Sequence, residues 1–574
     1  RGMKEASDVK LHVSISEAKL IEKDDPWSLP EIPKDDGPNW ADLTKKEKCL
    51  RVFKVSSKLL CVPFCLYVFV CSLGLMSDSF RLIAGRAAGS VFKDVKILQN
   101  PVVGVMIGIL VTVLVQSSST STTIIVSLVA AQVLTVDKAI PMIMGSNVGT
   151  SVTNTIVSFT QIGDKNVFRR AFAAATIHDM FNWLTVLSLL PIEIITGYLH
   201  QLSKVIVEGY NFHSDSGYEL KLLKTITDPL LNRIIQIDKQ VLKAWSLANI
   251  NTTDESVTQF ANSTSLLKRL CKFRNETTTY TAPCNYLFAD AGLSDLYVGL
   301  ILLGVSLICL CGCLMVIVKI LNSLLKGKIA TVIKNTINAD IKYLPWLSGY
   351  LAMLVGCGMT ILVQSSSIFT SALTPLAGLG VISLERIYPM TLGSNIGTTT
   401  TAILASLTAS GESLRLSIQI SLCHLFFNLS GILLFYVIPF TRLPVPLAKM
   451  MGDITATYRW FAVFYVVFMF FIFPGMVFAL SLAGTIAFMC VGIPIAVFLL
   501  IIVIINVLQK KFPSILPVIL RDWSFLPLWL HSLQPYDDLM MKCRCCRNRD
   551  GPPENISECN GTDNKAFQSR ETQL

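Results

Sequence analysis

Charged side chains are scarce in this 574-residue chain, because Lys, Arg, Asp and Glu together make up only 15 % of it, against about 25 % in typical soluble domains. Hydrophobic residues account for 52 %, and the mean hydropathy is +0.56. This composition excludes a soluble enzyme of the same length. Apolar runs long enough to span a bilayer recur from about Leu59 to Leu508, which predicts an all-α polytopic membrane protein.

The apolar runs and the polar stretches between them predict six consecutive parts. These are a cytosolic N-terminal segment (1–57), a first transmembrane repeat (58–200), an extracellular glycosylated loop (201–295), a second transmembrane repeat (296–440), C-terminal spans (441–509) and a cytosolic tail (510–574). The formal net charge of +10 could indicate nucleic-acid binding, but Lys and Arg concentrate before the first span and after the last. That distribution is typical of cytosolic flanks beside anionic lipid, so no nucleic-acid partner is expected.

The loop between the two repeats has the features of an exoplasmic segment. Most of the cysteines lie in apolar runs, where a free thiol behaves as a small hydrophobe. Cys271 and Cys284 instead accompany a polar stretch with three glycosylation sequons, at Asn251, Asn262 and Asn275. This combination predicts a glycosylated loop closed by a disulfide between the two cysteines.

An internal repeat relates the two transmembrane parts. The stretch Gln-Ser-Ser-Ser occurs at 116–119 and again 248 residues later at 364–367, and Gly-Ser-Asn-x-Gly-Thr occurs at 145–150 and at 393–398 with the same offset. A third element places His178 opposite His424, with an offset of 246 residues. Paired halves with polar interruptions predict two inverted repeats with re-entrant hairpins and broken helices, which is the organisation of a secondary transporter.

The duplicated serine stretches are candidates for an anion site. A polar run within hydrocarbon must line a protein-walled cavity or pair internally, and serine favours the N-cap of a helix. Two helix starts that face one another direct free N–H groups and positive dipole ends at an anion. The alternative is that the hydroxyls bond back to their own helices or hold helices together. The residues concerned are Gln116, Ser117, Ser118, Ser119, Gln364, Ser365, Ser366 and Ser367.

The repeated Gly-Ser-Asn-x-Gly-Thr motif is a candidate cation site. Its glycines permit the helix to unwind, and unwound carbonyls with amide and hydroxyl oxygens suit sodium. The alternative is that the small residues permit close helix packing. Neither 101–136 nor 348–384 contains Lys or Arg, so an anion bound there finds no fixed cation in those segments. We therefore expect co-transported sodium to supply the compensating charge.

Only the first half carries a carboxylate in its third element. Asp179 follows His178, and the spacing of Ala175, Asp179 and Asn182 places them on one helix face. An intramembrane carboxylate is a functional candidate, whereas a structural pairing with His178 or with another helix is the alternative. At the end of the preceding block, Gln161 and Asp164 either add oxygens to a cation site or form a solvated turn.

At these residues the sequence resembles the type II sodium-coupled inorganic phosphate cotransporters, from roughly Leu59 to Leu530. The resemblance implies phosphate and sodium binding at both serine stretches, and electrogenic transport from the pattern Ala173, Ala175 and Asp179. Asp25-Pro26-Trp27 and the tail cysteines Cys543, Cys545 and Cys546 favour the b subtype over the a subtype. The sodium-site residues it implies, together with Asp179, are Gln161, Asp164, Asn182, Ser394, Asn395, Thr398 and Thr401.

The expected function is therefore an electrogenic symporter of sodium and divalent phosphate, with another oxyanion such as sulfate as the alternative substrate. A membrane hydrolase built on Ser, His178 and Asp179 is disfavoured, because adjacent helical residues point about 100° apart and no Gly-x-Ser-x-Gly elbow is present. A passive channel is disfavoured because paired broken helices favour alternating access. No enzyme activity is expected, and no cofactor beyond sodium as co-substrate.

The remaining expectations concern partners and location. The chain ends in Thr572-Gln573-Leu574, a pattern that fits a PDZ groove by strand addition, although a tail without a partner explains it equally well. We expect a lipid bilayer and a second copy of the chain, as a homodimer, among the partners. The expected location is the plasma membrane, on the apical side of an epithelium, with both termini in the cytosol.

Overall fold

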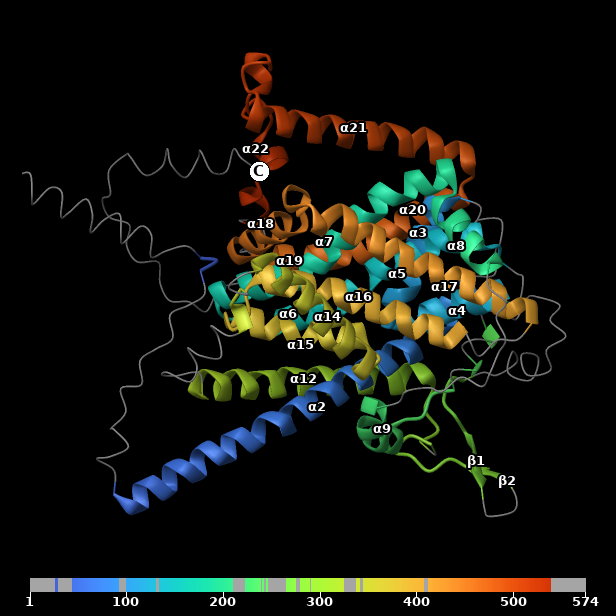
Figure 1. The fold of residues 1–574 in the computed structure, drawn as a ribbon, viewed down its shortest axis with the longest axis vertical. Coiled ribbons are helices and arrows are strands. Elements are labelled where there is room, and N and C mark those ends of the chain that lie inside the picture. The colour runs from blue at the N-terminus through green and yellow to red at the C-terminus, as the bar shows by residue number, and fades with distance from the viewer. Residues whose placement is uncertain are drawn as a thin grey trace, which may run out of the picture. The chain divides into compact units, whose positions relative to one another are not determined.

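The computed structural model of the chain divides into two compact units, Arg1–Ala456 and Thr457–Leu574. Within them it describes residues 26–28, 44–91, 100–130, 134–209, 222–238, 240–241, 244–245, 265–274, 279–289, 291–324, 337–340, 344–406 and 411–537. Nearly all of these residues are helical (Figure 1). The expected all-α architecture is therefore confirmed.

The first unit contains most of the helices. In chain order they are α2 (Lys45–Val91), α3 (Pro101–Val115), α4 (Ser118–Ala130), α5 (Val136–Gly149), α6 (Ser151–Ser158), η4 (Phe159–Gln161), α7 (Lys165–Thr196), α8 (Tyr198–Glu208), α9 (Leu222–Ile234), α12 (Asp295–Leu324), α14 (Pro345–Val363), α15 (Ser366–Gly378), α16 (Leu384–Ser406), α17 (Gly411–Ile432), η5 (Leu433–Val437), η6 (Pro439–Thr441) and α18 (Pro444–Thr457).

Equivalent helix pairs of the two halves pack in the same way. α3 lies against α5, and α14 lies against α16. A methyl group added at Gly108 would overlap the carbonyl of Met142, and one added at Gly356 would overlap the carbonyl of Met390. The second contact is the repeat equivalent of the first, because both of its residues lie 248 positions later in the sequence. Only glycine permits so close an approach of two helix backbones.

The repeated glycine motif differs from its expected form. Gly393 and Gly397 lie within the single helix α16, whereas Gly145 lies inside α5 and Gly149 is its last residue. Thr150, which links α5 to α6, keeps a helical backbone conformation. Methyl groups at Gly145 and Gly393 would overlap the carbonyls of Val105 and Met353. The glycines therefore bring helices together, and the helix does not unwind at them. The breaks in the fold occur instead at the serine stretches.

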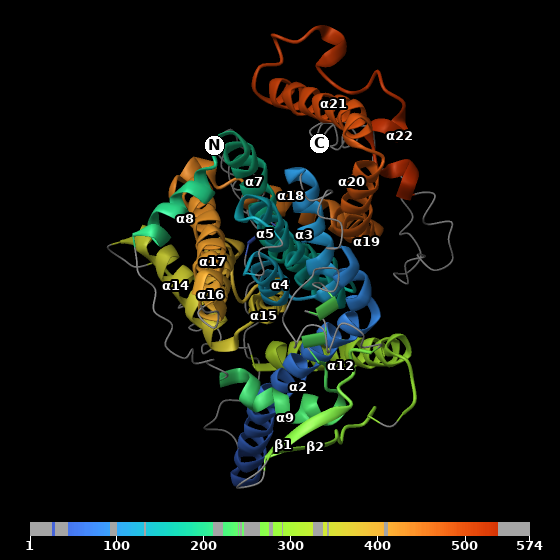
Figure 2. The same ribbon diagram turned by 90° about the vertical axis from the view of Figure 1, so that its right-hand side faces the viewer.

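Two long helices, α2 and α12, lie side by side at one edge of the first unit (Figures 1 and 2). Phe69, Leu73 and Met76 of α2 form a buried cluster with Leu310 of α12 and Val157 of α6. A second, larger cluster packs α7 against α15, α16 and the η5 segment, around Phe181 and Tyr388. The polar residues of the repeats thus lie between helices that apolar contacts hold in place.

The segment between the halves includes a small β-hairpin. β1 (Leu270–Arg274) pairs antiparallel with β2 (Thr279–Pro283), and Cys271 lies opposite Ala282. A disulfide joins Cys271 to Cys284. The helix α9 packs against α2. The sequon residues Asn251, Asn262 and Asn275 lie outside the described residues.

The second unit contains α19 (Arg459–Val467), the π-helix η7 (Phe468–Ile472), α20 (Phe473–Leu482), α21 (Thr485–Lys511), η8 (Val518–Leu520) and α22 (Leu528–His531). Within it, the indole of Trp460 donates a hydrogen bond to Asp537, and that of Trp523 to Asn506. Residues 572–574 and the three tail cysteines lie outside the described residues.

Seven of the described helices are long and apolar enough to cross a membrane. They include α2, α7, α12 and α14, a helix over Leu414–Val437, one over Arg459–Leu482, and α21. α3 and α4 are apolar but have only 15 and 13 residues, fewer than the roughly 20 that a crossing needs. Short apolar helices of this kind fit a re-entrant segment or a buried core helix, so the re-entrant hairpins stay a prediction. A polytopic membrane protein is confirmed, while the inverted orientation of the halves stays a prediction.

Candidate functional site: a cavity between two serine helix starts

Both serine stretches interrupt a helix at the glutamine. Gln116 and Gln364 adopt left-handed backbone conformations, with φ of 53° and 56°, and no other described non-glycine residue has a positive φ. Such a conformation is unfavourable for a residue with a side chain, and strained positions of this kind cluster at functional sites. α3 and α14 end at the residue before the glutamine, and α4 and α15 each begin two residues after it.

Serine side chains cap both of the new helices. The Ser117 hydroxyl accepts a hydrogen bond from the Thr120 backbone N–H at 3.2 Å, and the Ser365 hydroxyl accepts one from the Ile368 N–H at 3.3 Å. These are equivalent positions of the repeat. Two capped helices therefore begin at the sites that the sequence predicts, each with its partly positive end at the serines.

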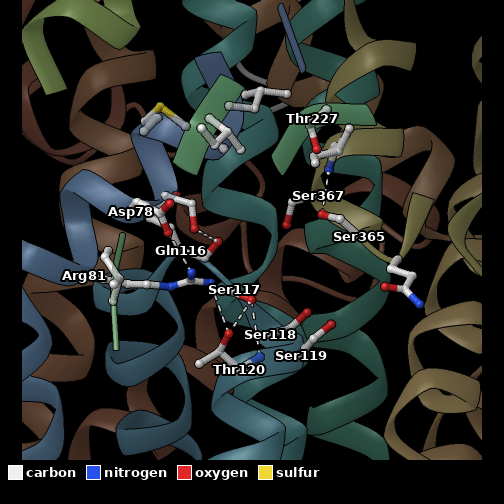
Figure 3. A pocket seen from close by; sticks show the side chains of 18 of the residues that line it. Asp78, Arg81, Gln116, Ser117, Ser118, Ser119, Thr120, Thr227, Ser365 and Ser367 are labelled. Carbon is white, nitrogen blue, oxygen red and sulfur yellow. Dashed lines mark hydrogen bonds and ion pairs between the residues drawn. The ribbon is translucent and has the colours of Figure 1, made fainter. Parts of the chain in front are cut away.

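The two helix starts open on one cavity. Its volume is about 630 Å³, and its walls come from α2, α4, α6, α9, α14 and α15 and from the Gln-Ser links before α4 and α15 (Figure 3). All eight residues predicted to bind phosphate line it, namely Gln116, Ser117, Ser118, Ser119, Gln364, Ser365, Ser366 and Ser367. The structure thus brings together two motifs 248 residues apart in the sequence.

Hydrogen bonds of the two glutamines hold the helix breaks in place. The Gln116 amide donates to the Val113 carbonyl at 2.6 Å and accepts from the Thr153 hydroxyl at 3.0 Å. It is 6 % exposed, so it stabilises the break between α3 and α4. The Gln364 backbone N–H closes the last turn of α14 on the Thr360 carbonyl at 2.7 Å.

A charged pair on α2 also lines the cavity, which sequence reasoning missed. Arg81 forms an ion pair with Asp78 at 2.8 Å, and its side chain is 12 % exposed. Figure 3 shows the guanidinium directed at Ser117 and Thr120. Neither residue belongs to a repeated motif, and both follow the apolar run predicted as the first span. The signal that could have found them is their spacing of three residues, which places them on one face of that helix.

The predicted sodium residues divide into separate places. Asn182, Asn395 and Ser394 lie in a buried polar cluster together with His178, His424 and Asn147. The Asn395 amide donates to Asn182 at 3.0 Å, and the Asn182 amide donates to the Asn147 carbonyl at 2.8 Å. We refer to these six residues as the inter-half cluster, because its hydrogen bonds connect the two repeats.

The hydroxyl contacts around this cluster repeat as well. Thr112 donates to Ser146 at 2.8 Å in the first half, and Thr360 donates to Ser394 at 2.8 Å in the second. Thr398 donates back to the Ser394 carbonyl at 3.0 Å. Hydroxyl, amide and carbonyl oxygens are the donors that a hard cation such as sodium prefers.

Gln161 and Asp164 lie elsewhere in the fold. Gln161 is buried at the end of η4 against Gly378, which has no room for a methyl group beside it. Asp164 is exposed and caps α7, accepting from the N–H groups of Asn166 and Val167 at 2.9 Å. Thr401 lies in α16, and its side chain is outside the described residues. Gln161 and Asp164 therefore do not join the inter-half cluster in this structure.

The residues assigned to electrogenicity are fully buried on α7. Ala173, Ala175 and Asp179 each have 0 % exposure, as does Asn182. Asp179 is thus an intramembrane carboxylate adjacent to the inter-half cluster along one helix. Among the described residues no group of three or more His, Cys, Asp or Glu side chains could hold a metal ion.

A cavity between two capped helix starts, with a buried polar cluster that joins the halves, defines a polytopic membrane protein with an internal site for a small polar solute. The Na+/Pi-cotransporter family model matches residues 68–192 and 314–454. No solved structure matches the chain.

Curated relatives match over most of their length. The chain is 49 % identical to sodium-dependent phosphate transport protein 2B of Homo sapiens, over 94 % of this chain and 83 % of that protein. It is 51 % identical to protein 2B of Mus musculus, over 92 % and 79 %, and 52 % identical to protein 2A of Rattus norvegicus, over 88 % and 80 %. The chain belongs to the Na+/Pi-cotransporter family, a family of transporters and not of enzymes. The b subtype stays a prediction.

Proposed function

We propose that the chain is a secondary active symporter that couples sodium entry to the uptake of inorganic phosphate. The observation that carries the proposal is the meeting of two capped helix starts, at equivalent positions of the two halves, on one cavity of about 630 Å³. Helix N-termini with free N–H groups bind oxyanions. The relatives are named sodium-dependent phosphate transport proteins, which favours phosphate over sulfate.

Alternating access follows from where the two kinds of site lie. The serine cavity is formed by both halves, and the inter-half cluster crosses between them. Sodium bound at oxygens of the cluster would change the hydrogen bonds that join the halves. The same hydrogen bonds must break or rearrange when the halves move apart, so sodium binding shifts the equilibrium between conformations of the two halves. Sodium as co-substrate thus couples to the exposure of the phosphate site.

We assign the charge of the transported complex to Asp179. A buried carboxylate in the membrane is stable when a cation accompanies it, so it provides for one sodium ion more than a divalent phosphate neutralises. This assignment makes transport electrogenic. It is supported by the complete burial of Asp179 and by its position on the face of α7 that carries Asn182.

The test is radiolabelled phosphate uptake with simultaneous current recording in voltage-clamped cells, with sodium present or replaced by choline. Sodium-dependent uptake with inward current is the expected result. Replacing Ser118 or Ser366, which are 4 % and 3 % exposed, by tryptophan should abolish uptake while surface protein remains. Ser514, which is exposed and outside the cavity, is the matched position for a neutral Ser→Trp change. Absence of sodium-dependent uptake from surface-expressed protein would refute the function.

The finer expectations on location and partners remain part of this proposal. We place the transporter in the apical plasma membrane with cytosolic termini, with glycans at Asn251, Asn262 and Asn275, a PDZ scaffold at Thr572–Leu574 and a second copy in a homodimer. Their support is the sequence pattern alone. Deleting residues 572–574 should reduce surface retention without changing the affinity for phosphate.

A further inference from the structure

Arg81 occupies the wall of the cavity with its hydrogen-bonding capacity only partly used. One Nη1–H donates to Asp78 at 2.8 Å, and one Nη2–H donates to the Thr120 hydroxyl at 3.1 Å. A guanidinium carries five N–H donors. Its Nε is buried and has no hydrogen-bond partner among the described residues, so the donors left for an anion are the second N–H groups of Nη1 and Nη2. The cation therefore lies beside the phosphate-binding serines with donors that the protein does not fill.

Arg81 also determines which way the Ser117 hydroxyl points. The Thr120 oxygen accepts from Arg81, and the Thr120 hydroxyl donates to the Ser117 oxygen at 3.0 Å. That oxygen already accepts from the Thr120 backbone N–H at 3.2 Å. Because a hydroxyl has two acceptor sites, both are occupied, and Ser117 can only donate to whatever lies in the cavity. A donor is what an oxyanion needs.

The second half has no equivalent of this arrangement. Ile368 stands where the repeat places Thr120 in the first half, and it lines the same cavity. Ser365 consequently receives the backbone N–H of Ile368 but no side-chain hydrogen bond from it. The two helix starts are thus alike in backbone and different in charge. The bound anion has one wall with a guanidinium and one without.

We propose that Arg81 is a substrate-contacting residue that selects the charged oxygens of the anion and, through Thr120, holds Ser117 as a donor to it. Asp78 opposes this role, because its carboxylate competes with the anion for the same guanidinium. The proposal rests on the phosphate transport proposed above. It also adds a fixed cation from α2 to a cavity whose serine segments contain no Lys or Arg, while the carboxylates of Asp78 and Asp228 line the same cavity and offset its charge.

The experiment measures phosphate uptake against phosphate concentration, at saturating sodium and per transporter at the cell surface, in the full-length chain. Arg81→Gln should raise the half-saturation concentration of phosphate by about tenfold or more, as expected for the loss of a charge-assisted hydrogen bond. Asp78→Asn should lower it, because the guanidinium is released to the anion. Thr120→Val should raise it by less than Arg81→Gln, because direct contact with Arg81 survives.

The matched control is Arg386→Gln. Arg386 is equally buried, with 11 % exposure, and pairs with Asp340 at 2.6 Å, but it lies outside the cavity. Its loss should reduce surface protein at most, with the phosphate half-saturation concentration unchanged. Because Arg81→Gln could fail to reach the surface, Arg81→Lys is tested beside it. Lysine keeps the charge without the planar fork, so we expect a rise of about threefold or more.

Three outcomes overturn the proposal while leaving phosphate symport intact. The first is wild-type half-saturation in Arg81→Lys or in surface-expressed Arg81→Gln. The second is an equal rise in Asp78→Asn and Arg81→Gln, which would make the pair a structural element only. The third is an equal rise in Thr120→Val and Arg81→Gln, which would exclude direct contact. Failure of the wild-type chain to take up phosphate would instead refute the proposed function itself.

Discussion

The imidazole Nε2 of His178 lies 2.6 Å from the side-chain oxygen of Asn395. The equivalent atom of His424 lies 3.1 Å from the side-chain oxygen of Asn147. In each pair the histidine belongs to one half and the asparagine to the other. The Asn395 amide nitrogen donates to Asn182, so its oxygen is the acceptor and His178 carries its proton on Nε2. Two motifs that look independent in the sequence therefore form crossed contacts.

This crossing predicts that the histidines act on sodium coupling. His178→Ala and His424→Ala each leave a buried asparagine oxygen without its donor, which costs about 1–3 kcal/mol, and each disturbs the inter-half cluster. We expect the half-saturation concentration of sodium to rise about tenfold in either variant, while the half-saturation for phosphate at saturating sodium changes less. Sodium activation curves of phosphate uptake measure both.

The double variant sharpens this prediction. His178 and His424 act on one connected cluster, so their effects should be non-additive. Additive effects would show that the two pairs work separately, and an unchanged sodium dependence in both single variants would contradict the assigned role.

A second prediction concerns Asp179. Replacing it by glycine removes the buried carboxylate and with it the place for the extra sodium charge, so sodium-dependent uptake should persist while net current per phosphate falls to zero. Uptake and current recorded in the same cell give the ratio. Asp137→Gly, at an exposed position in the first turn of α5, should retain the wild-type ratio. A wild-type ratio in Asp179→Gly would remove Asp179 from the charge assignment.

A third prediction concerns pH and the stability of the second half. The Ser348 hydroxyl at 2.7 Å, followed by the guanidinium of Arg386, holds the pKa of Asp340 below its usual value. A carboxyl whose pKa is lower in the folded state stabilises the fold above its unfolded pKa, and this contribution disappears as the pH falls through the folded pKa. The Asp340 side chain is 62 % exposed, so solvent screening keeps the contribution small.

Asp340→Asn should therefore lower the midpoint of thermal unfolding in detergent by about one degree or less at pH 7. At a pH below the folded pKa of Asp340 the two proteins should unfold together, because the wild-type carboxyl is then neutral. If the midpoints of the two proteins differ equally at both pH values, the effect comes from the changed side-chain packing and hydrogen bonds and not from the charge of Asp340.

The sequence predicts the serine cavity well because the local signal and the tertiary arrangement agree there. Glutamine followed by three serines marks a helix start, and a duplicated start in an apolar setting requires a shared polar cavity. The residues predicted to bind sodium are not gathered in one place, since Gln161 and Asp164 lie away from Asn182 and Asn395, and the sodium site stays a prediction. The sequence could not place Arg81, because the contact of α2 with α4 depends on helix packing. No spacing within α2 reveals which helix its polar face meets.

The last prediction concerns two glycines of α14, which lie in the same helix but have different neighbours. A methyl group at Gly356 would overlap the carbonyl of Met390, whereas one at Gly358 would have no atom within 4 Å. Gly356→Ala should therefore force α14 from α16 and destabilise the protein by about 1–3 kcal/mol, the usual cost of overpacking. Gly358→Ala should be neutral or stabilising by up to about 1 kcal/mol, since alanine favours helix. Thermal unfolding followed by fluorescence-detected size exclusion compares the two variants directly. Equal midpoints would contradict the close approach of the helices, and loss of surface protein in Gly356→Ala alone would support it.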